Sequence, residues 1–372
     1  MESMAHMERA LLLAARGLGH VSPNPMVGAV VLTQQGAVVG EGWHEGPGTP
    51  HAEVMALEQA GERARGGAMV VTLEPCDHTG MTGPCSEALI SAGIAEVVAA
   101  TQDPNPLVNG SGFDRLRSAG VRVSVGPAEE GATSLNRAFL QHLRTGLPWV
   151  TLKMASTLDG KSAARDGTSK WITGVEARAD VQQLRAWADA VVIGSGTALA
   201  DDPSLTLRDP RYARARSPLR VLVDSSGRVP PSGHLFDTAA PTLVATTART
   251  ADALVRAWEN AGAEVLVCDA GSQGRVSLGA LLADLGKRDI QGVLVEGGAG
   301  IAWGAVAEGI IDDVVLYLAP KLIGGDDAPS MVAGTGFAPI SAALQLEFTS
   351  AEQIGPDLKV VARVHRDHRG AR

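Results

Sequence analysis

Residues 51–85 read HAEVMALEQAGERARGGAMVVTLEPCDHTGMTGPC, and this stretch decides how the first half of the chain is interpreted. It places His51 ahead of two cysteines, Cys76 and Cys85, each of which directly follows a proline. One imidazole and two thiolates can occupy three corners of a tetrahedral zinc site, and an open fourth corner distinguishes a catalytic site from a structural one. The stretch therefore predicts a catalytic zinc centre.

Glu53 stands two residues after the first of these ligands, so its carboxylate can reach a water on the metal without binding the metal itself. Zinc lowers the pKa of its bound water from 15.7 to about 7, and a neighbouring carboxylate can pass the proton to leaving ammonia. His-x-Glu followed by Pro-Cys and a second cysteine is the signature of zinc deaminases. The residues therefore favour a hydrolytic deaminase with Glu53 as the proton shuttle.

The spacing of the two cysteines departs from that signature. Its usual second half is Pro-Cys-x-x-Cys, whereas eight residues separate Cys76 from Cys85. The alternative is that the cysteines are small buried apolar side chains. Two of the three cysteines of the chain fall in this stretch, and residues 77–83 between them form a polar, glycine-containing loop. These two facts favour zinc.

Composition limits the class of protein. With 372 residues, 45% hydrophobic and 20% charged, the chain is long enough for two globular domains. Its formal net charge of −9 argues against nucleic-acid and anionic-membrane partners, but a local site can still hold a phosphorylated small molecule. Three cysteines make no disulfide framework. No signal-peptide core occurs in residues 1–16 and no apolar run reaches about 18 residues, so a cytoplasmic enzyme is expected.

Hydrophobic periodicity predicts two successive α/β patterns. The first has helices over 4–18, 51–65, 85–92, 113–119 and 129–144, and strands over 27–32, 37–43, 68–73, 97–100 and 121–125. The second has helices over 175–188, 251–261 and 278–287, and a further helix that follows residues 296–300 and ends at 308. Its strands are predicted over 149–155, 190–193, 219–223, 242–245, 265–267, 292–295, 314–318, 344–348 and 358–364. The last two strands are expected to be antiparallel. The Gly-Pro-containing stretch 145–148 predicts domains 1–146 and 147–372.

Two glycine-bearing turns in the second half predict a dinucleotide site. Residues 296–300 read EGGAG and link a strand to a helix, and residues 194–197 read GSGT after another strand. Glycine lets a phosphate approach the backbone, and a helix N-terminus offers N–H donors. Ligands of α/β sheets gather at such carboxyl ends of strands. A full Gly-x-Gly-x-x-Gly pattern is absent, so an ordinary strand-to-helix turn remains the alternative.

Lys153 lies in an otherwise apolar strand. A buried lysine usually has a partner, so a site residue and a solvent-facing lysine on an edge strand both remain open. Asp201 and Asp202 are interpreted as a solvated turn rather than a metal site. The remaining residues considered are assigned to the surface or to packing: His142, His234, His365, His368 and Cys268.

The motifs together resemble one known family, the bifunctional riboflavin-biosynthesis deaminase–reductases. Residues 22–85 are similar to the deaminase domain, which also carries the long insert between the cysteines. The second half is similar to the reductase domain through its motifs LDG at 158–160, KWIT at 170–173, DDP at 201–203, VEGG at 295–298 and APK at 319–321. The resemblance covers nearly the whole chain in the order of the family.

The resemblance implies a cytidine-deaminase-like three-layer α/β/α domain followed by a dihydrofolate-reductase-like α/β domain, not a Rossmann domain. It implies two successive reactions. The first removes the 2-amino group of 2,5-diamino-6-(5-phosphoribosylamino)pyrimidin-4(3H)-one as ammonia. The second reduces the ribosyl side chain to ribityl with NADPH.

The family's site residues carry over by position. One zinc ion per chain is implied on His51, Cys76 and Cys85, with Glu53 as proton shuttle and with Asn24, His44 and His78 around the pyrimidine. NADPH contacts are implied for Ala155, Trp171, Thr197, Asp201, Ser225, Gly297, Gly298, Ala299, Gly300, Ile301, Ala302, Trp303 and Gly304. Substrate contacts in the reductase are implied for Lys153, Ser169, Arg185, Leu205, Arg208 and Glu296. Arg185 and Arg208 are expected to bind phosphate, because guanidinium pairs with phosphate bidentately.

Three positions depart from the family. Met81 stands where a basic residue is frequent, Gly83 where a second proline is frequent, and Ala155 where glycine is common. Met81 removes a cation that could hold the substrate's phosphate, so the affinity of the deaminase for its substrate is in question.

Two other functions stay open at this point. One is a nucleoside or tRNA deaminase with an unrelated C-terminal half, although the negative charge and the scarcity of aromatic residues speak against tRNA. The other is a non-catalytic zinc-stabilised binding module, against which the position of Glu53 counts. Phosphorylated pyrimidines are the expected ligands and a homo-oligomer is the expected assembly, without nucleic-acid or membrane partners.

Overall fold

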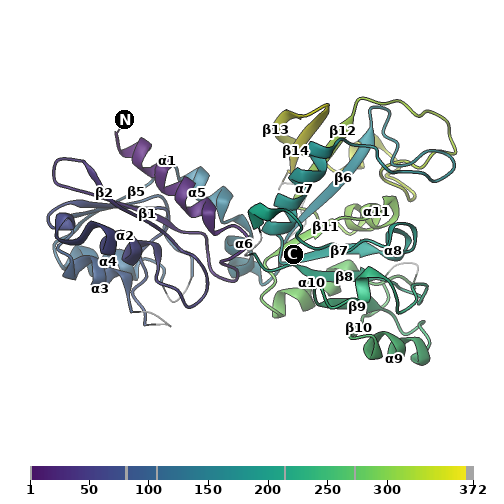
Figure 1. Ribbon diagram of the computed structural model, residues 1–372, viewed down its shortest axis with the longest axis horizontal. Coiled ribbons are helices and arrows are strands. Elements are labelled where there is room, and N and C mark those ends of the chain that lie inside the picture. Colours follow the sequence, from purple (N-terminus) through teal and green to yellow (C-terminus); the bar gives the residue numbers. More distant parts are fainter. Residues whose placement is uncertain (1, 80–82, 106–107, 213–214, 272–273, 366–372) are drawn as a thin grey trace. The chain divides into compact units, whose positions relative to one another are not determined.

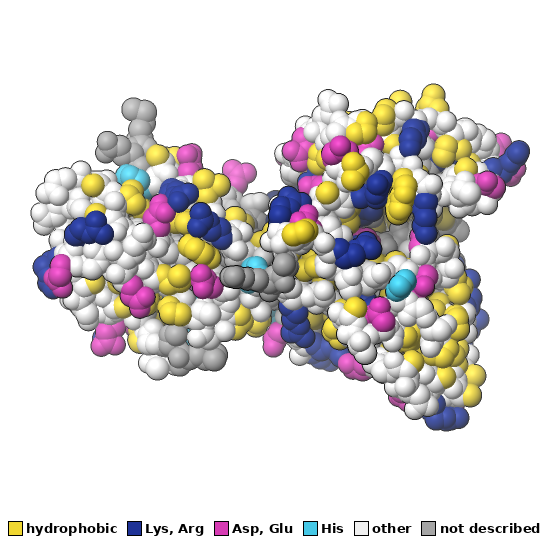
Figure 2. Space-filling view, in the orientation of Figure 1, with side chains coloured by type: hydrophobic (Ala, Val, Ile, Leu, Met, Phe, Trp, Pro, Cys, Tyr) yellow, Lys and Arg dark blue, Asp and Glu magenta, His cyan; other side chains and the backbone are white. Residues whose placement is uncertain are grey.

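The computed structural model describes residues 2–79, 83–105, 108–212, 215–271 and 274–365. The chain divides into two compact α/β units, Met1–Gly146 and Leu147–Arg372 (Figure 1). None of the described helices is both long and apolar enough to cross a membrane. Basic and acidic side chains are interspersed over the visible face of each unit (Figure 2), so recognition of a charged ligand falls to local pockets.

The first unit is built on a five-stranded mixed sheet. Its helices are α1 (Glu2–Ala14), α2 (Ala52–Ala60), α3 (Cys85–Ser91), α4 (Ser111–Ser118), α5 (Glu129–Leu135) and α6 (Arg137–Thr145). Its strands are β1 (Gly28–Leu32), β2 (Val38–Trp43), β3 (Ala68–Val71), β4 (Glu96–Ala99) and β5 (Arg122–Val125). The strand order is β2-β1-β3-β4-β5. Strand β1 is antiparallel to both neighbours, whereas β3, β4 and β5 are parallel.

Helices cover both faces of this sheet. Successive strand residues point to opposite faces, so β1 contributes Ala29 and Val31 to one core and Val30 to the other. The first core contains side chains of α2, α3 and α4, and the second contains side chains of α1. The three-layer α/β/α arrangement expected of this domain is therefore confirmed.

One predicted helix is wrong in extent. The periodicity predicts a single helix over 129–144, but α5 ends at Leu135 and α6 begins at Arg137. Asn136 between them is buried, and its side chain accepts the Met26 N–H at 2.8 Å and donates to the Met26 carbonyl at 2.9 Å. This pairing with a segment 110 residues away interrupts the helix and is invisible to local periodicity.

The second unit is built on a nine-stranded sheet. Its helices are α7 (Val175–Trp187), α8 (Ser195–Asp201), α9 (Asp252–Asn260), α10 (Leu278–Lys287) and α11 (Ala299–Ala307). Its strands are β6 (Trp149–Thr157), β7 (Ala190–Gly194), β8 (Leu219–Val223), β9 (Thr242–Thr246), β10 (Glu264–Val267), β11 (Gly292–Val295), β12 (Asp313–Ala319), β13 (Leu346–Ile354) and β14 (Asp357–Val364). The order is β10-β9-β8-β7-β11-β6-β12-β14-β13.

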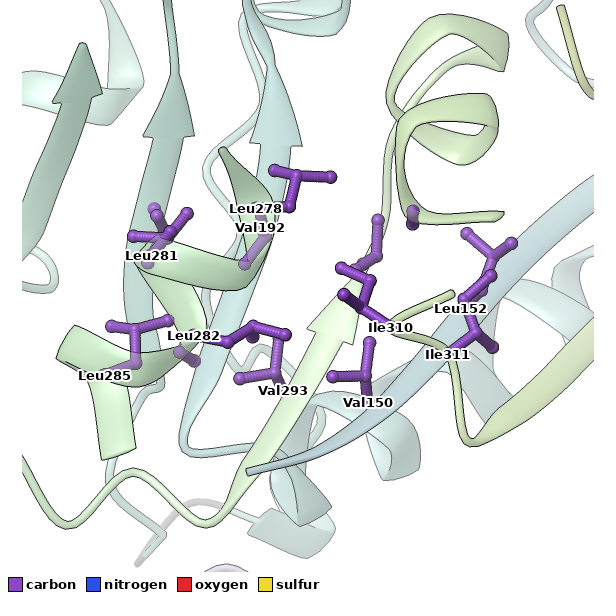
Figure 3. Close-up of a cluster of buried hydrophobic side chains, with 14 of the residues drawn as sticks. Val150, Leu152, Val192, Leu278, Leu281, Leu282, Leu285, Val293, Ile310 and Ile311 are labelled. Carbon is purple, nitrogen blue, oxygen red and sulfur yellow. The ribbon is translucent and has the colours of Figure 1, made fainter. Parts of the chain in front are cut away.

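The strands from β10 to β12 in this order are parallel, and β14 and β13 close the sheet as an antiparallel pair, as predicted. The larger core contains leucines of α10 and aliphatic side chains of the central strands, among them Leu281, Val192 and Val293 (Figure 3). The core on the other face contains Trp258 of α9. The sheet thus presents the carboxyl ends of its parallel strands along one edge.

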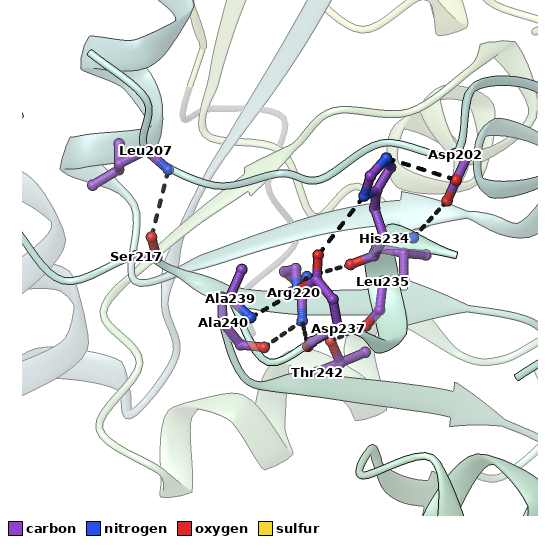
Figure 4. Close-up of polar contacts among 10 residues, drawn as sticks. All are labelled: Asp202, Leu207, Ser217, Arg220, His234, Leu235, Asp237, Ala239, Ala240 and Thr242. Atoms are coloured by element: carbon purple, nitrogen blue, oxygen red, sulfur yellow. Dashed lines mark hydrogen bonds and ion pairs between the residues drawn. The ribbon is translucent and has the colours of Figure 1, made fainter. Parts of the chain in front are cut away.

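A buried arginine fixes the loop that follows β8. Arg220 is fully buried and donates to the carbonyls of His234, Asp237 and Ala240 and to the Asp237 carboxylate (Figure 4). His234 in turn lies 4.0 Å from an Asp202 oxygen and donates its backbone N–H to Asp202 at 2.8 Å. The exposed position predicted for His234 is correct, but it lies at the rim of a pocket described below.

Two local predictions in the second unit need correction. The sequence predicts a turn over 194–197, but residues 195–201 form the helix α8, with Gly194 as its N-cap. The alternative of a solvent-facing Lys153 on an edge strand is wrong, because β6 lies between β11 and β12. Strand order depends on long-range pairing, so the central position of β6 could not be read from the local sequence.

Candidate active sites

The three predicted zinc ligands lie together. One potential ligand atom from each of His51, Cys76 and Cys85 lies within 4.8 Å of the others. His51 Nδ1 is 3.2 Å from Cys85 Sγ and 3.5 Å from Cys76 Sγ. Two ligand atoms of a tetrahedral zinc ion with Zn–S of 2.3 Å and Zn–N of 2.0–2.1 Å are about 3.5–3.8 Å apart. The geometry of the donor set therefore fits zinc.

Helix starts place these side chains. His51 is the N-cap of α2, Cys85 is the first residue of α3, and Cys76 lies in the turn that follows β3. The Cys85 backbone N–H donates to Cys76 Sγ at 3.5 Å. Hydrogen bonds from the Cys85 thiol and from His51 lower the pKa of Cys76, because they stabilise its thiolate. Cys76 is therefore prepared to act as an anionic ligand.

Glu53 is buried in the first turn of α2, beside the three ligands. Burial raises the pKa of Glu53 to about 7, and the negative charge of Cys76 adds to this effect. A general acid or base works best when its pKa lies near the working pH. Glu53 can therefore both accept and donate a proton near neutral pH.

The residues predicted to contact the pyrimidine line the same pocket as the candidate zinc site. Asn24, His44 and His78 line it together with Glu53. Asn24 Nδ2 is 3.0 Å from His44 Nε2, and His44 Nδ1 is 3.5 Å from the carbonyl of Pro50. Burial lowers the pKa of His44, which favours the neutral form of its imidazole. The pocket can thus offer hydrogen bonds to a neutral heterocycle.

Asp103 and Asn105 are among the polar residues of this pocket that sequence reasoning missed. The Asp103 carboxylate accepts the Asn105 N–H at 2.9 Å, and burial raises the pKa of Asp103. Both residues follow β4, which pairs in parallel with β3. The rule that ligands gather at carboxyl ends of parallel strands was therefore an available signal.

A buried carboxylate brings this missed segment to the metal site. Glu74 accepts backbone N–H groups from Asp103, Gly110, Gly112 and Phe113 at 3.0–3.3 Å. Glu74 is two residues before Cys76 in the chain, so one side chain links the turn that carries a ligand to the loop that carries Asp103.

Of the departures from the family, Met81 lies outside the described residues.

The predicted reductase-substrate residues line a second pocket. All six of them face it: Lys153, Ser169, Arg185, Leu205, Arg208 and Glu296. Arg185 and Glu296 form a buried bidentate ion pair, with Nε–Oε1 at 2.7 Å and Nη2–Oε2 at 2.9 Å. Burial opposes ionisation of Glu296, but Arg185 outweighs it, so the pKa of Glu296 lies below its ordinary value. Burial lowers the pKa of Lys153, which is near both charges.

The predicted cofactor residues follow the same edge of the sheet. Ala155, Trp171 and Gly297 line the second pocket, and Ser225, Ala299, Gly300, Ile301, Trp303 and Gly304 line a third. Thr197, Asp201 and Gly298 line both, so the two pockets are continuous. Thr197 Oγ1 accepts the Gly298 N–H at 2.9 Å and joins the two glycine-bearing turns. Ala302 is the exception, because its side chain is fully buried in the core.

Asp201 pairs with Lys170 at 3.6 Å. Among the described residues, the cluster of metal-ligating side chains is that of His51, Cys76 and Cys85, and it does not include Asp201 or Asp202.

Two family profiles match this chain. The RibD C-terminal domain matches residues 148–360, and the cytidine and deoxycytidylate deaminase zinc-binding region matches residues 1–101. The riboflavin biosynthesis protein RibD of Escherichia coli strain K12 is 41% identical in an alignment of 368 residues, which covers 96% of this chain and 98% of the relative. The chain belongs to the RibD family.

Solved RibD structures agree in fold. Acinetobacter baumannii RibD, form 1, matches with a TM-score of 0.88 at 38% identity, covering 98% of this chain and 99% of that chain. A Thermotoga maritima structure named diaminohydroxyphosphoribosylaminopyrimidine deaminase/5-amino-6-(5-phosphoribosylamino)uracil reductase matches with 0.86 at 35% identity and the same coverage. The alternative of an unrelated C-terminal half is therefore wrong.

As a RibD protein, the chain is a bifunctional deaminase and reductase of riboflavin biosynthesis that uses zinc and NADPH. The predicted family, fold class and cofactors are confirmed. The alternative of a non-catalytic binding module is wrong. The roles of individual site residues are proposals, which follow.

Proposed function

We propose that the first unit removes the 2-amino group of 2,5-diamino-6-(5-phosphoribosylamino)pyrimidin-4(3H)-one and that the second unit then reduces the ribosyl side chain to ribityl. The observation that carries the first step is the meeting of His51, Cys76 and Cys85 within 4.8 Å, with Glu53 buried beside them. The Thermotoga maritima structure, which is named for both a deaminase and a reductase, supports this pair of activities.

In the first step, His51, Cys76 and Cys85 would hold a zinc ion, which would supply an activated water beside Glu53. Glu53 accepts a proton from that water and donates it to the amino group as the C–N bond breaks. The hydroxyl left on C2 of the pyrimidine gives its proton to the adjacent ring nitrogen, so that a carbonyl forms at C2 as ammonia leaves. A pKa of about 7 suits Glu53 to both transfers. Asn24 and neutral His44 orient the pyrimidine.

In the second step, the second unit would hold NADPH, which would supply a hydride to C1′ of the ribosyl group. The bond between C1′ and the ring oxygen breaks, and that oxygen takes up a proton from solvent. We assign Arg208 to the substrate's phosphate, because no ion pair occupies its guanidinium among the described residues, whereas Arg185 is paired with Glu296. Arg185 then holds Glu296 as an anion facing the pocket. Lys153 faces the same pocket and carries a donor next to that carboxylate.

For partners, we propose phosphorylated pyrimidines as ligands and a homo-oligomer as the assembled state. Strand β13 is the edge of its sheet, and Phe348 on it is 78% exposed. Uncovered edge strands favour pairing with another chain.

Glu53→Gln tests the first role. The amide cannot accept the proton from water, so ammonia release is expected to fall by at least about a hundredfold, the lower end of what general acid–base catalysis contributes. NADPH oxidation with the deaminated intermediate is expected to stay at the wild-type rate, because that chemistry belongs to the second unit. Ammonia release and NADPH absorbance measure the two steps separately.

Glu58→Gln is the matched control, since Glu58 is exposed on the same helix. Wild-type ammonia release by Glu53→Gln, or equal losses in both variants, would remove Glu53 from the mechanism.

A further inference from the structure

Three arginines line the part of the third pocket that the cofactor contacts above leave unexplained. They are Arg228, Arg249 and Arg275. Arg228 follows β8, Arg249 follows β9, and Arg275 precedes α10. The three come from separate segments, so their meeting at one pocket is a property of the fold.

Hydrogen bonds tie the three segments together. Ser225 Oγ accepts the N–H of Val276, next to Arg275, at 3.0 Å. Thr247 Oγ1 donates to the Ser225 carbonyl at 2.7 Å and accepts the Arg249 N–H at 3.3 Å. The three segments that carry the arginines are therefore held together by hydrogen bonds.

A buried aspartate holds the first of these segments. The carboxylate of Asp224 accepts the backbone N–H groups of Arg228 at 2.6 Å and Val229 at 2.7 Å. The Arg228 guanidinium donates to Ser195 Oγ at 2.7 Å, on the glycine-bearing turn after β7. The arginine end of the pocket is thus joined to the part that holds the predicted cofactor contacts.

Within the described part of the chain, no ion pair joins any of the three arginines to a carboxylate. The Arg249 guanidinium donates to the carbonyl of Gly274 instead. The acidic side chains on this pocket have other partners: Asp201 pairs with Lys170, and Glu308 accepts the N–H groups of Leu278 and Gly279. The positive charge at this end is therefore free for an anion.

The position along the sheet indicates which anion. The strand order β9-β8-β7-β11-β6 places the arginine loops two and three strands away from the glycine turn after β11 (Figure 1). At about 4.8 Å per strand, this is roughly 10–14 Å. A dinucleotide whose pyrophosphate lies at the turns after β11 and β7, with its nicotinamide toward β6, extends its adenosine over β8 and β9.

We propose that Arg228, Arg249 and Arg275 bind the 2′-phosphate on the adenosine of NADPH and thereby select NADPH over NADH. This inference rests on the NADPH-dependent reduction proposed above. A phosphate monoester carries a charge of about −1.5 to −2 at pH 7, and guanidinium groups match its oxygens bidentately. NADH has a hydroxyl at this position and cannot use the charge.

Binding of cofactor fragments tests the proposal without turnover. Isothermal titration calorimetry on the full chain compares adenosine 2′,5′-bisphosphate with adenosine 5′-monophosphate. The wild type is expected to bind the bisphosphate at least tenfold more tightly. Arg228→Met, Arg249→Met and Arg275→Met are each expected to reduce that preference, and the triple variant to abolish it. The NADPH-to-NADH ratio of kcat/KM is expected to fall in parallel.

Arg256→Met is the matched control, because Arg256 is exposed on α9 and does not line the pocket. Ammonia release by the first unit and the circular dichroism spectrum show that the variants are folded. A triple variant that keeps the wild-type preference for the bisphosphate overturns the proposal, as does a wild type that binds NADPH without any such preference. A wild type that binds no NADPH overturns the proposed reduction as well.

Discussion

Two buried glutamates, Glu53 and Glu296, show how partners decide what a carboxyl group does. Burial raises the pKa of Glu53 to about 7, and the negative charge of the Cys76 thiolate acts in the same direction. Burial acts on Glu296 in the same direction, but the guanidinium of Arg185 overrides it and the pKa falls. The first residue can exchange protons near neutral pH, whereas the second remains an anion that orders its pocket.

The three cysteines are expected to differ in reactivity. Burial, with the charges of Asp284 and Asp269, raises the pKa of Cys268 to about 11. Since the thiolate is the nucleophile, only about one Cys268 side chain in a thousand is reactive at pH 8. Hydrogen bonds lower the pKa of Cys76, whereas the hydrogen bond to Cys76 and burial raise the pKa of Cys85. Iodoacetamide is therefore expected to modify Cys76 after zinc chelation and to leave Cys85 and Cys268 largely unmodified. The rate at Cys268 should rise about tenfold per pH unit until the pH approaches 11.

Peptide mass spectrometry measures each cysteine separately, and zinc-loaded protein is the control, in which Cys76 is expected to be protected. Equal alkylation of Cys76 with and without zinc would contradict its role as a ligand.

At the scale of elements, the first active site depends on how the loop after β4 is held. Glu74 accepts four backbone N–H groups from residues 103–113. Each oxygen of Glu74 accepts two of these N–H groups. In Glu74→Gln an NH₂ group replaces one oxygen, so two of the four backbone N–H groups lose their acceptor. Because Asp103 and Asn105 line the pocket, KM for the deaminase substrate is expected to rise about tenfold, equivalent to about 1.4 kcal/mol. Zinc content, measured by mass spectrometry, is expected to remain at one per chain.

Glu96→Gln is the control for this prediction. Glu96 pairs with Arg122 at 2.9 Å on the surface, where such pairs contribute about 0–1 kcal/mol. A Glu74→Gln enzyme with the KM of the control would show that the loop holds its position without this carboxylate.

Helices and strands followed the sequence patterns where the pattern was strong and local. Residues 278–287 and 292–295 were predicted with the bounds that α10 and β11 have. Asn136 is the counter-example, because a hydrogen-bonded partner at Met26 replaced helical continuation. Such interruptions depend on which distant backbone is near, and no window of neighbouring residues contains that information.

At the scale of the whole molecule, each unit has its own hydrophobic cores, and each cluster of buried apolar residues draws on one unit alone. Asn136→Ala removes two buried hydrogen bonds and leaves Met26 unsatisfied, so it is expected to lower the free energy of unfolding of the first unit by about 2–3 kcal/mol. Ammonia release is then expected to fail at lower urea concentration than in the wild type, while NADPH oxidation with the deaminated intermediate fails at the wild-type concentration.

Activity measured across a urea series with both substrates checks this expectation, and Ser134→Ala on the exposed surface of α5 is the control. Equal shifts of both activities in Asn136→Ala would mean that the units unfold as one.

The amino-acid pattern was sufficient to identify the chemistry: the ligand types, the acid beside them, the glycine turns and the order of the elements. These signals are carried by residues close together in the chain, where spacing alone limits what they can do. Contacts across more than a hundred residues, such as Arg185 with Glu296 and Asn136 with Met26, required the folded chain. The same holds for the arginine group on the third pocket, because the order of strands in a sheet decides which loops meet, and that order follows from packing over the whole unit.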